Sequence, residues 1–242
     1  MKMQGKTTLK KKGPIGILGG MGTVATQHLL QKIIGLSKAK KDQDFPPFIL
    51  YNYPQIPDRT EAILGKSKKP AKFLIKGLKK LEAAGASPLA MDCNSAYAFY
   101  NDIKKKVKTK TINLIDETSK KLAKKYPGIK KIGILATTGA LKAELYEKSL
   151  AKLGNFKFVY PMQKEIMELI YGKKGIKANN LTQSKKLSKI LSALEKKGAE
   201  ATIIGCTDLS TLISEKNAKF RLIDSTATLA EIIIKSHQKS AK

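Results

Sequence analysis

Short apolar runs alternate with longer amphipathic stretches over almost the whole chain. The apolar runs predict buried strands, and the stretches with apolar residues at helical spacing predict helices. The expected strands are Ile15–Leu18, Phe48–Asn52, Leu89–Asp92, Ile112–Ile115, Lys131–Leu135, Phe156–Tyr160, Ala201–Gly205 and Phe220–Ile223. The expected helices are Gly22–Ser37, Pro70–Ala84, Leu141–Leu153, Pro161–Tyr171 and Thr182–Lys197. This alternation predicts an α/β fold with parallel strands.

Parts of the first half of the sequence recur in the second half in the same order. Ile15–Leu18 and Ile132–Leu135 both read Ile-Gly-Ile-Leu, and a glycine near the start of an expected helix follows each of them. A pattern of Leu-Glu, Gly-Ala and Cys occurs twice with the same spacing and ends at Cys93 and at Cys206. A third echo joins Leu114–Thr118 to Leu222–Thr226. These repeats predict two related halves.

The repeats also predict how the halves are built. We expect two similar Rossmann-like (flavodoxin-like) domains, each with a parallel four-stranded sheet, related by a pseudo-two-fold axis. The expected division is a disordered basic leader over 1–12, a first α/β domain over 13–115 and 224–242, and a second over 116–223. Each cysteine directly follows a predicted strand, at the edge of a parallel sheet where ligands bind. We therefore expect the active site in the cleft between the domains.

The chain is strongly basic, with 47 Lys and Arg against 19 Asp and Glu and a formal net charge of +28. Arginine occurs only at Arg59 and Arg221. Proteins that recognise nucleic acids favour arginine, whose guanidinium group forms bidentate hydrogen bonds with phosphates and guanine edges. The scattered lysines therefore indicate a solvated surface that attracts small acids, and we expect no nucleic-acid partner.

Two further features concern the compartment. No segment approaches the roughly 18 to 20 apolar residues of a membrane span, and the polar N-terminus does not resemble a secretory signal. Two cysteines without an export signal indicate a reducing environment and free thiols. We expect a cytoplasmic protein with no membrane partner.

The two cysteines are the main candidates for chemistry. A free cysteine is usually a small buried apolar residue, but here each precedes residues that cap helices, Asn94-Ser95 and Thr207-Asp208. A thiol at a helix N-terminus is expected to have a lowered pKa. A disulfide switch stays open, whereas no metal site is expected because the spacing of ligands is unsuitable. Inversion at a carbon needs an acid and a base on opposite faces, which a duplicated fold supplies.

Six motifs in order resemble the aspartate/glutamate racemase family, and in particular its cofactor-independent aspartate racemase branch. The resemblance covers nearly the whole chain after the leader. The motifs are Gly19–Gly22, Pro57–Thr60, Asp92–Ala96, Leu135–Gly139, Ile170–Ala178 and Gly205–Leu209.

The resemblance implies an isomerase that interconverts L- and D-aspartate between two domains, as a homodimer and without a cofactor. Cys93 and Cys206 would be its acid and base, one as thiolate and one as thiol in each direction. Asn94, Ser95 and Thr207 match positions that hold the substrate α-carboxylate, as helix N-termini do for anions.

The resemblance also implies residues that select the substrate. Arg59 matches an arginine of the aspartate-specific branch and offers a bidentate clamp for a second carboxylate. Lys177 matches a second ligand of that carboxylate. Thr138 resembles a further substrate contact, and Met21 is expected to line the floor of the cleft, where glycines allow a close approach of the backbone.

The chain departs from the family pattern at three positions. Ser95 stands where threonine is more frequent, Tyr97 where histidine is, and Asp208 where glutamate is. Serine keeps the hydroxyl and aspartate keeps the carboxylate with a shorter reach. Tyr97 removes an imidazole, which bears on the pKa values of the thiols more than on the type of reaction.

Several other functions remain as alternatives. Glutamate or broad-specificity racemase activity is the nearest, followed by maleate isomerase or decarboxylase chemistry on the same fold. A pyridoxal-phosphate enzyme would need a lysine Schiff base and would leave the paired cysteines unexplained. Outside enzymes, the alternative is a protein that binds an anion or a nucleic acid.

Overall fold

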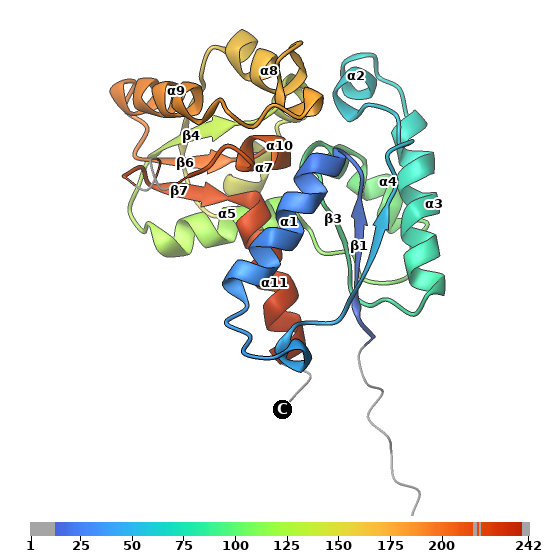
Figure 1. The fold of residues 1–242 in the computed structure, drawn as a ribbon. Helices are drawn as coiled ribbons and strands as arrows, with labels where there is room; N and C mark the ends of the chain where they lie inside the picture. Colours follow the sequence, from blue (N-terminus) through green and yellow to red (C-terminus); the bar gives the residue numbers. More distant parts are fainter. Residues whose placement is uncertain (1–12, 215–216, 218, 239–242) are drawn as a thin grey trace, which may run out of the picture.

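The computed structural model describes residues 13–214, 217 and 219–238. The predicted basic leader, 1–12, lies outside the described residues. Two parallel sheets form the centre of the molecule, as Figure 1 shows, and helices cover them. The predicted α/β fold with two parallel sheets is therefore confirmed.

The first sheet has the strand order β2-β1-β3. Its strands are β1 (Ile15–Gly19), β2 (Phe48–Asn52) and β3 (Leu89–Met91). The central strand β1 is buried at every position, as expected for an apolar strand covered on both faces. The helices of this part are α1 (Thr23–Leu36), η1 (Asp42–Asp44), α2 (Arg59–Leu64), α3 (Lys69–Ala83), η2 (Ser95–Phe99) and α4 (Tyr100–Lys104).

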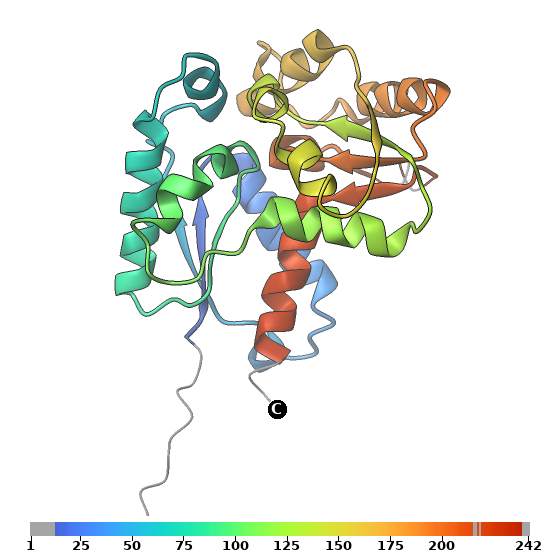
Figure 2. The ribbon, with the colours of Figure 1, turned by 180° about the vertical axis from the view of Figure 1, so that it is seen from behind.

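The second sheet has the strand order β5-β4-β6-β7, which repeats the order of the first sheet with one strand more. Its strands are β4 (Lys131–Leu135), β5 (Lys157–Val159), β6 (Ala201–Ile204) and β7 (Leu222–Asp224). The view from behind, Figure 2, shows helices on both sides of this sheet. The helices of this part of the chain are α5 (Leu114–Lys125), α6 (Thr138–Lys142), α7 (Leu145–Leu150), α8 (Gln163–Tyr171), η3 (Ile176–Ala178), α9 (Ser184–Lys196), α10 (Thr207–Ser210) and α11 (Ser225–Gln238).

The predicted strand Ile112–Ile115 is wrong. Only a single parallel bridge, from Leu89 to Thr111, occupies the place of a fourth strand in the first sheet. Asn113 ends the extended segment because its side chain accepts hydrogen bonds from the backbone N–H groups of Ile115 and Asp116 and caps α5. Leu114 is already helical, whereas its sequence echo Leu222 lies in a strand, so the third echo is not a structural repeat.

The Gly-Ala pair that precedes each cysteine in the second repeat does have a structural basis. Its alanine packs against a glycine of the central strand in both halves. A Cβ atom at Gly16 would lie 2.8 Å from the Cβ of Ala86. A Cβ atom at Gly133, the matching residue of β4, would lie 3.4 Å from the Cβ of Ala199. Each half therefore uses one glycine to bring the turn after a long helix close to its central strand.

Two other features of the chain path differ from the expectation or add to it. The predicted helix Leu141–Leu153 is divided into α6 and α7, because Glu144 between them has a left-handed backbone with φ 53°. Helix α11 follows β7 of the second sheet and packs against α1 of the first (Figure 1). The division of the chain at 115 and 224 stays a prediction. Among the described helices, none has both the length and the apolar character needed to cross a bilayer.

One buried residue of the first half is chemically unusual. Asp92, directly after β3, is fully buried, and neither oxygen of its carboxyl group has a hydrogen-bond partner among the described residues. Burial raises the pKa of this carboxyl to about 7; the nearby side chain of Thr26 opposes the rise, and the carboxylates of Asp208 and Asp224 add to it. An unpaired buried carboxylate is costly, so the folded protein favours the protonated form.

We predict that Asp92→Asn stabilises the protein at neutral and alkaline pH. The unfolded chain releases this proton near pH 3.8 and the folded protein near pH 7, so the wild type loses stability as the pH rises between these values. The variant carries no such proton, and its advantage should grow over this range to as much as about 4 kcal/mol. Urea unfolding of both proteins at a series of pH values measures the difference.

The control for this prediction is Asp102→Asn, which removes a partly exposed carboxylate paired with an exposed lysine, Lys68, and should shift the free energy of unfolding little. A difference between Asp92→Asn and wild type that does not change with pH would contradict the expected ionisation.

Candidate active site

A pocket lies where the carboxyl ends of the two sheets face each other. Four of its lining residues follow shortly after a central or neighbouring strand: Met21 after β1, Cys93 after β3, Thr137 after β4 and Cys206 after β6. The pocket contains about 280 Å³ of space, part of it open to solvent. The full lining is Met21, Arg59, Thr60, Cys93, Asn94, Ser95, Thr137, Tyr171, Lys177, Cys206, Thr207 and Asp208.

Both cysteines are free and nearly buried in the wall of this pocket. Cys206 itself is the N-cap residue of α10, so Thr207 and Asp208, which we expected to cap this helix, lie in its first turn instead. Burial nevertheless raises the pKa of its thiol to about 12, and the carboxylate of Asp208 adds to the rise. The backbone N–H groups of Asp208 and Leu209 lower this pKa, but by less. The lowered pKa that we expected at a helix N-terminus is therefore wrong for Cys206.

Arg59 is buried at the start of α2, and its guanidinium group is held by the backbone. Nη2 donates to the carbonyl of Met21 at 2.7 Å, and Nη1 donates to the carbonyls of Ile56 and Pro57 at 3.2 Å. Nε is buried and has no hydrogen-bond partner among the N and O atoms of the described residues. Burial alone would lower the pKa of Arg59, but Cys93 and the carboxylate of Asp58 outweigh it and raise that pKa.

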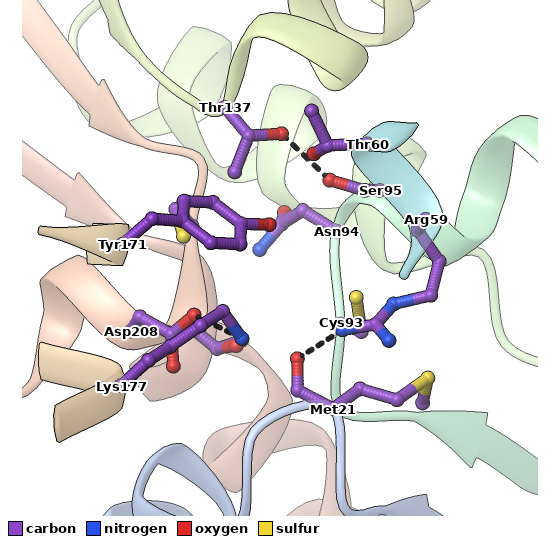
Figure 3. A pocket seen from close by; sticks show the side chains of 12 residues that line it. Met21, Arg59, Thr60, Cys93, Asn94, Ser95, Thr137, Tyr171, Lys177 and Asp208 are labelled. Carbon is purple, nitrogen blue, oxygen red and sulfur yellow. Dashed lines mark hydrogen bonds and ion pairs between the residues drawn. The ribbon is translucent and has the colours of Figure 1, made fainter. Parts of the chain in front are cut away.

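Lys177 stands on the opposite side of the pocket, as Figure 3 shows, together with Asp208 and Tyr171. Its Nζ lies 3.5 Å from Oδ2 of Asp208 and 5.2 Å from the centre of the Tyr171 ring. An anionic ligand that binds Lys177 must therefore share the lysine with Asp208. Burial raises the pKa of the Asp208 carboxyl, and Lys177 opposes the rise.

The glycine-rich turn after β1 allows these groups to come together. Gly20 has φ +88°, and a Cβ atom there would lie 2.5 Å from the backbone nitrogen of Tyr53. A Cβ atom at Gly22 would lie 3.3 Å from Oδ1 of Asp208 and 3.7 Å from Nζ of Lys177. The turn therefore approaches the second half closely, as predicted, and leaves room for the ion pair.

The polar residues after the cysteines have partners of their own. The amide of Asn94 donates to Ser225 at 2.9 Å and accepts from the hydroxyl of Tyr146, so both of its ends are engaged. The hydroxyl groups of Ser95 and Thr137 are hydrogen-bonded at 2.9 Å. This contact joins the two halves within the pocket wall, where Figure 3 shows it. The Thr137 hydroxyl also accepts a hydrogen bond from the backbone N–H of Ala140 at 3.3 Å and so caps α6.

Other contacts near the pocket also join the halves. The Tyr171 hydroxyl donates to Oδ2 of Asp58 at 3.0 Å. A Cβ atom at Gly139 of α6 would lie 2.7 Å from the Cα of Thr60 in α2. The two short helices are thus in direct contact beside the pocket.

The structure brings together all but one of the site residues that we expected. Thr138 does not line the pocket; its hydroxyl accepts a hydrogen bond from Gln163, and the preceding Thr137 occupies the pocket wall. Tyr97 also lies elsewhere, since its buried hydroxyl donates to the carbonyl of Ile112. The tyrosine at this position is therefore packed and hydrogen-bonded within the core of the first half.

Four lining residues were not among the expected ligands: Thr60, Thr137, Tyr171 and Asp208. All four lie inside motifs that the sequence had already singled out, so the motifs located them and only their side-chain directions were missing. Together the pocket offers two thiols, two cations, a carboxylate and several hydroxyl groups. Such a set suits a small acid that carries more than one charge and undergoes proton transfer.

Several known proteins that are similar to this chain along almost its whole length are racemases or racemase homologues. The Broad specificity amino-acid racemase RacX of Bacillus subtilis is 28% identical over 230 residues, which are 92% of this chain and 97% of that protein. The solved structure of Picrophilus torridus aspartate racemase is 31% identical with a TM-score of 0.83, covering 93% of this chain and 95% of that one. An aspartate racemase homologue from Pyrococcus horikoshii is 26% identical with a TM-score of 0.72, covering 93% and 99%.

A family model described as Asp/Glu/Hydantoin racemase matches residues 18–233, which run from the first strand into the last helix and include every residue of the pocket lining. The chain therefore belongs to the Asp/Glu/hydantoin racemase family.

Proposed function

We propose that this racemase-family protein interconverts L- and D-aspartate without a cofactor, with Cys93 and Cys206 as a pair of acid and base. The observation that carries the proposal is that both thiols line one pocket together with the cations Arg59 and Lys177. Aspartate has a second carboxylate, for which Arg59 and Lys177 are the expected ligands. The similarity to an aspartate racemase along almost the whole chain supports this choice of substrate.

The proposed reaction removes one proton from the α-carbon and adds one proton to its opposite face. A thiolate on one side of the substrate removes the α-hydrogen and becomes a thiol, while the thiol on the other side donates its proton to the opposite face and becomes a thiolate. The product is the other enantiomer, and the total number of protons is unchanged.

The main difficulty of this reaction is the weak acidity of the α-hydrogen. The pocket would have to stabilise the negative charge that develops beside the α-carboxylate, using cations and N–H donors already in place. Asn94, Ser95 and Thr207 are the residues expected at that carboxylate, and all three line the pocket. Arg59, whose guanidinium group is fixed by three backbone carbonyl groups, is the residue expected at the second carboxylate. The burial of both cysteines keeps water from competing for the protons.

A broader choice of substrates is the second candidate. The 28% identity to a broad-specificity amino-acid racemase favours it. Lys177 is also partly exposed and paired with Asp208, so a second carboxylate of the substrate would compete with Asp208 for this lysine. The homodimer, the cytoplasmic location and the absence of a nucleic-acid partner stay predictions.

We predict that Cys93→Ala and Cys206→Ala each lower racemisation of aspartate by at least about 100-fold, because each removes one of two proton carriers. The measurement is chiral analysis and deuterium uptake after incubation of L-aspartate and, separately, L-glutamate and L-alanine in deuterated buffer. Deuterium that enters together with formation of the D-isomer identifies both reaction and substrate. A cysteine variant that retains wild-type conversion would rule out the two-base mechanism.

Lys177→Met should lower kcat/KM for aspartate by about 10- to 100-fold, since a charge-assisted bond to the second carboxylate is lost. The value for alanine, which lacks that carboxylate, should change much less. Lys173→Met is the matched control, because it removes an exposed lysine of the same segment that does not line the pocket. Equal losses for aspartate and alanine would show that Lys177 does not read the second carboxylate.

A further inference from the structure

A buried tyrosine of the second half holds a residue of the pocket wall without lining the pocket itself. Tyr146, in α7, is 1% exposed and is not among the lining residues. Its hydroxyl donates a hydrogen bond to the side-chain oxygen of Asn94, which lines the pocket and directly follows Cys93. One side chain of the second half therefore holds the segment of the first half that carries Cys93.

The glycine before the other cysteine determines where the ring of Tyr146 lies. A Cβ atom at Gly205 would be 2.5 Å from Cε2 of this ring and 3.2 Å from its Cδ2, which is closer than carbon atoms pack. The backbone N–H of Gly205 donates to the carbonyl of Leu135 at 2.7 Å, so the glycine is tied to the neighbouring strand. The ring thus packs directly on the segment that leads into Cys206, and this packing fixes the position of its hydroxyl.

The nitrogen end of the Asn94 amide is held as well. Nδ2 donates to the hydroxyl of Ser225 at 2.9 Å, and Ser225 is fully buried at the start of α11. A rotation that exchanged the oxygen and the nitrogen would break both bonds in a buried place, where each loss is costly. An amide nitrogen carries two N–H groups, so it can donate one to Ser225 and the other to an anion in the pocket.

We infer that Tyr146 is a positioning residue for the substrate: it holds the amide of Asn94 so that an N–H group, and not the oxygen, meets the α-carboxylate. This inference rests on the proposed function, in which Asn94 binds that carboxylate. Tyr146 acts only through Asn94, because it does not line the pocket. Its loss should therefore affect all amino-acid substrates equally, since all of them carry an α-carboxylate.

The first test is Tyr146→Phe, which removes the hydroxyl and keeps the ring against Gly205. We expect kcat/KM to fall about 10-fold for aspartate and by the same factor for any other amino acid that the wild type racemises. Tyr97→Phe is the matched control, because it also removes a buried hydroxyl, which donates to the carbonyl of Ile112 away from the pocket. The control should lose similar stability in urea unfolding but keep its kcat/KM.

A double-mutant cycle separates a positioning role from a role in packing. In the background of Asn94→Ala, Tyr146→Phe should cause no further loss of kcat/KM, because the group that the hydroxyl holds is already gone. If the two losses multiply instead, Tyr146 acts by some route other than Asn94 and the inference is overturned. Equal losses for Tyr146→Phe and Tyr97→Phe would overturn it too.

Binding can be measured without turnover on the Asn94 side chain itself. Its amide gives a nitrogen-15 signal in nuclear magnetic resonance spectra, which Asn94→Ala identifies by its disappearance. We expect this signal to shift as L-aspartate is added to the wild type, and the Kd from the titration to rise about 10-fold in Tyr146→Phe but not in Tyr97→Phe. An Asn94 signal that does not respond to aspartate would overturn the inference.

These results distinguish the inference from the proposed function. If aspartate binds as expected but its α-hydrogen does not exchange, the proposed function fails and the role of Tyr146 in binding stands. If the wild type racemises aspartate but Tyr146→Phe does so equally well, only the inference fails. Should Tyr146→Phe not fold, Ser225→Ala removes the other partner of the amide and should likewise lower kcat/KM, with no further loss in the Asn94→Ala background.

Discussion

The buried guanidinium group of Arg59 is the interaction on which the pocket depends. It bonds to the carbonyl of Met21 after β1 and to two carbonyls before α2, so one side chain fixes two of the loops of the first half that line the pocket. A buried charge must be compensated by its surroundings, and Cys93 and Asp58, followed by Tyr171, raise its pKa. The position of the first thiol, its cation and the glycine-rich turn are therefore linked.

Sequence alone located all the expected strands but one and most of the residues that line the pocket, but not the direction of every side chain. Strands such as β1 and β4 were predictable because a continuous apolar run suits only a buried position in a parallel sheet. The strand expected at Ile112–Ile115 failed because the apolar pattern was followed through Asn113, whose capping side chain starts a helix instead. Thr138 and Thr137 could not be distinguished, since the sequence does not say which of two adjacent residues turns into the pocket.

Electrostatic properties were the least predictable part of the site. The position of Cys206 before a helix correctly indicated its place, but not the raised pKa of its thiol, because that depends on burial and on Asp208. The substitution of tyrosine for histidine at Tyr97 suggested altered thiols, yet its hydroxyl donates to a carbonyl in the core. In each case, the missing information was the three-dimensional neighbourhood of a group whose place in the chain was known.

The two walls of the pocket differ, so the protein can treat the two enantiomers differently, but only within a thermodynamic limit. Two enantiomers have the same free energy in water, so kcat/KM must be equal in the two directions whatever the protein does. A pocket with Arg59 on one wall and an Asp208–Lys177 pair on the other is not its own mirror image. The asymmetry can therefore appear only as compensating differences in kcat and KM, with the enantiomer that binds more tightly being the one that turns over more slowly.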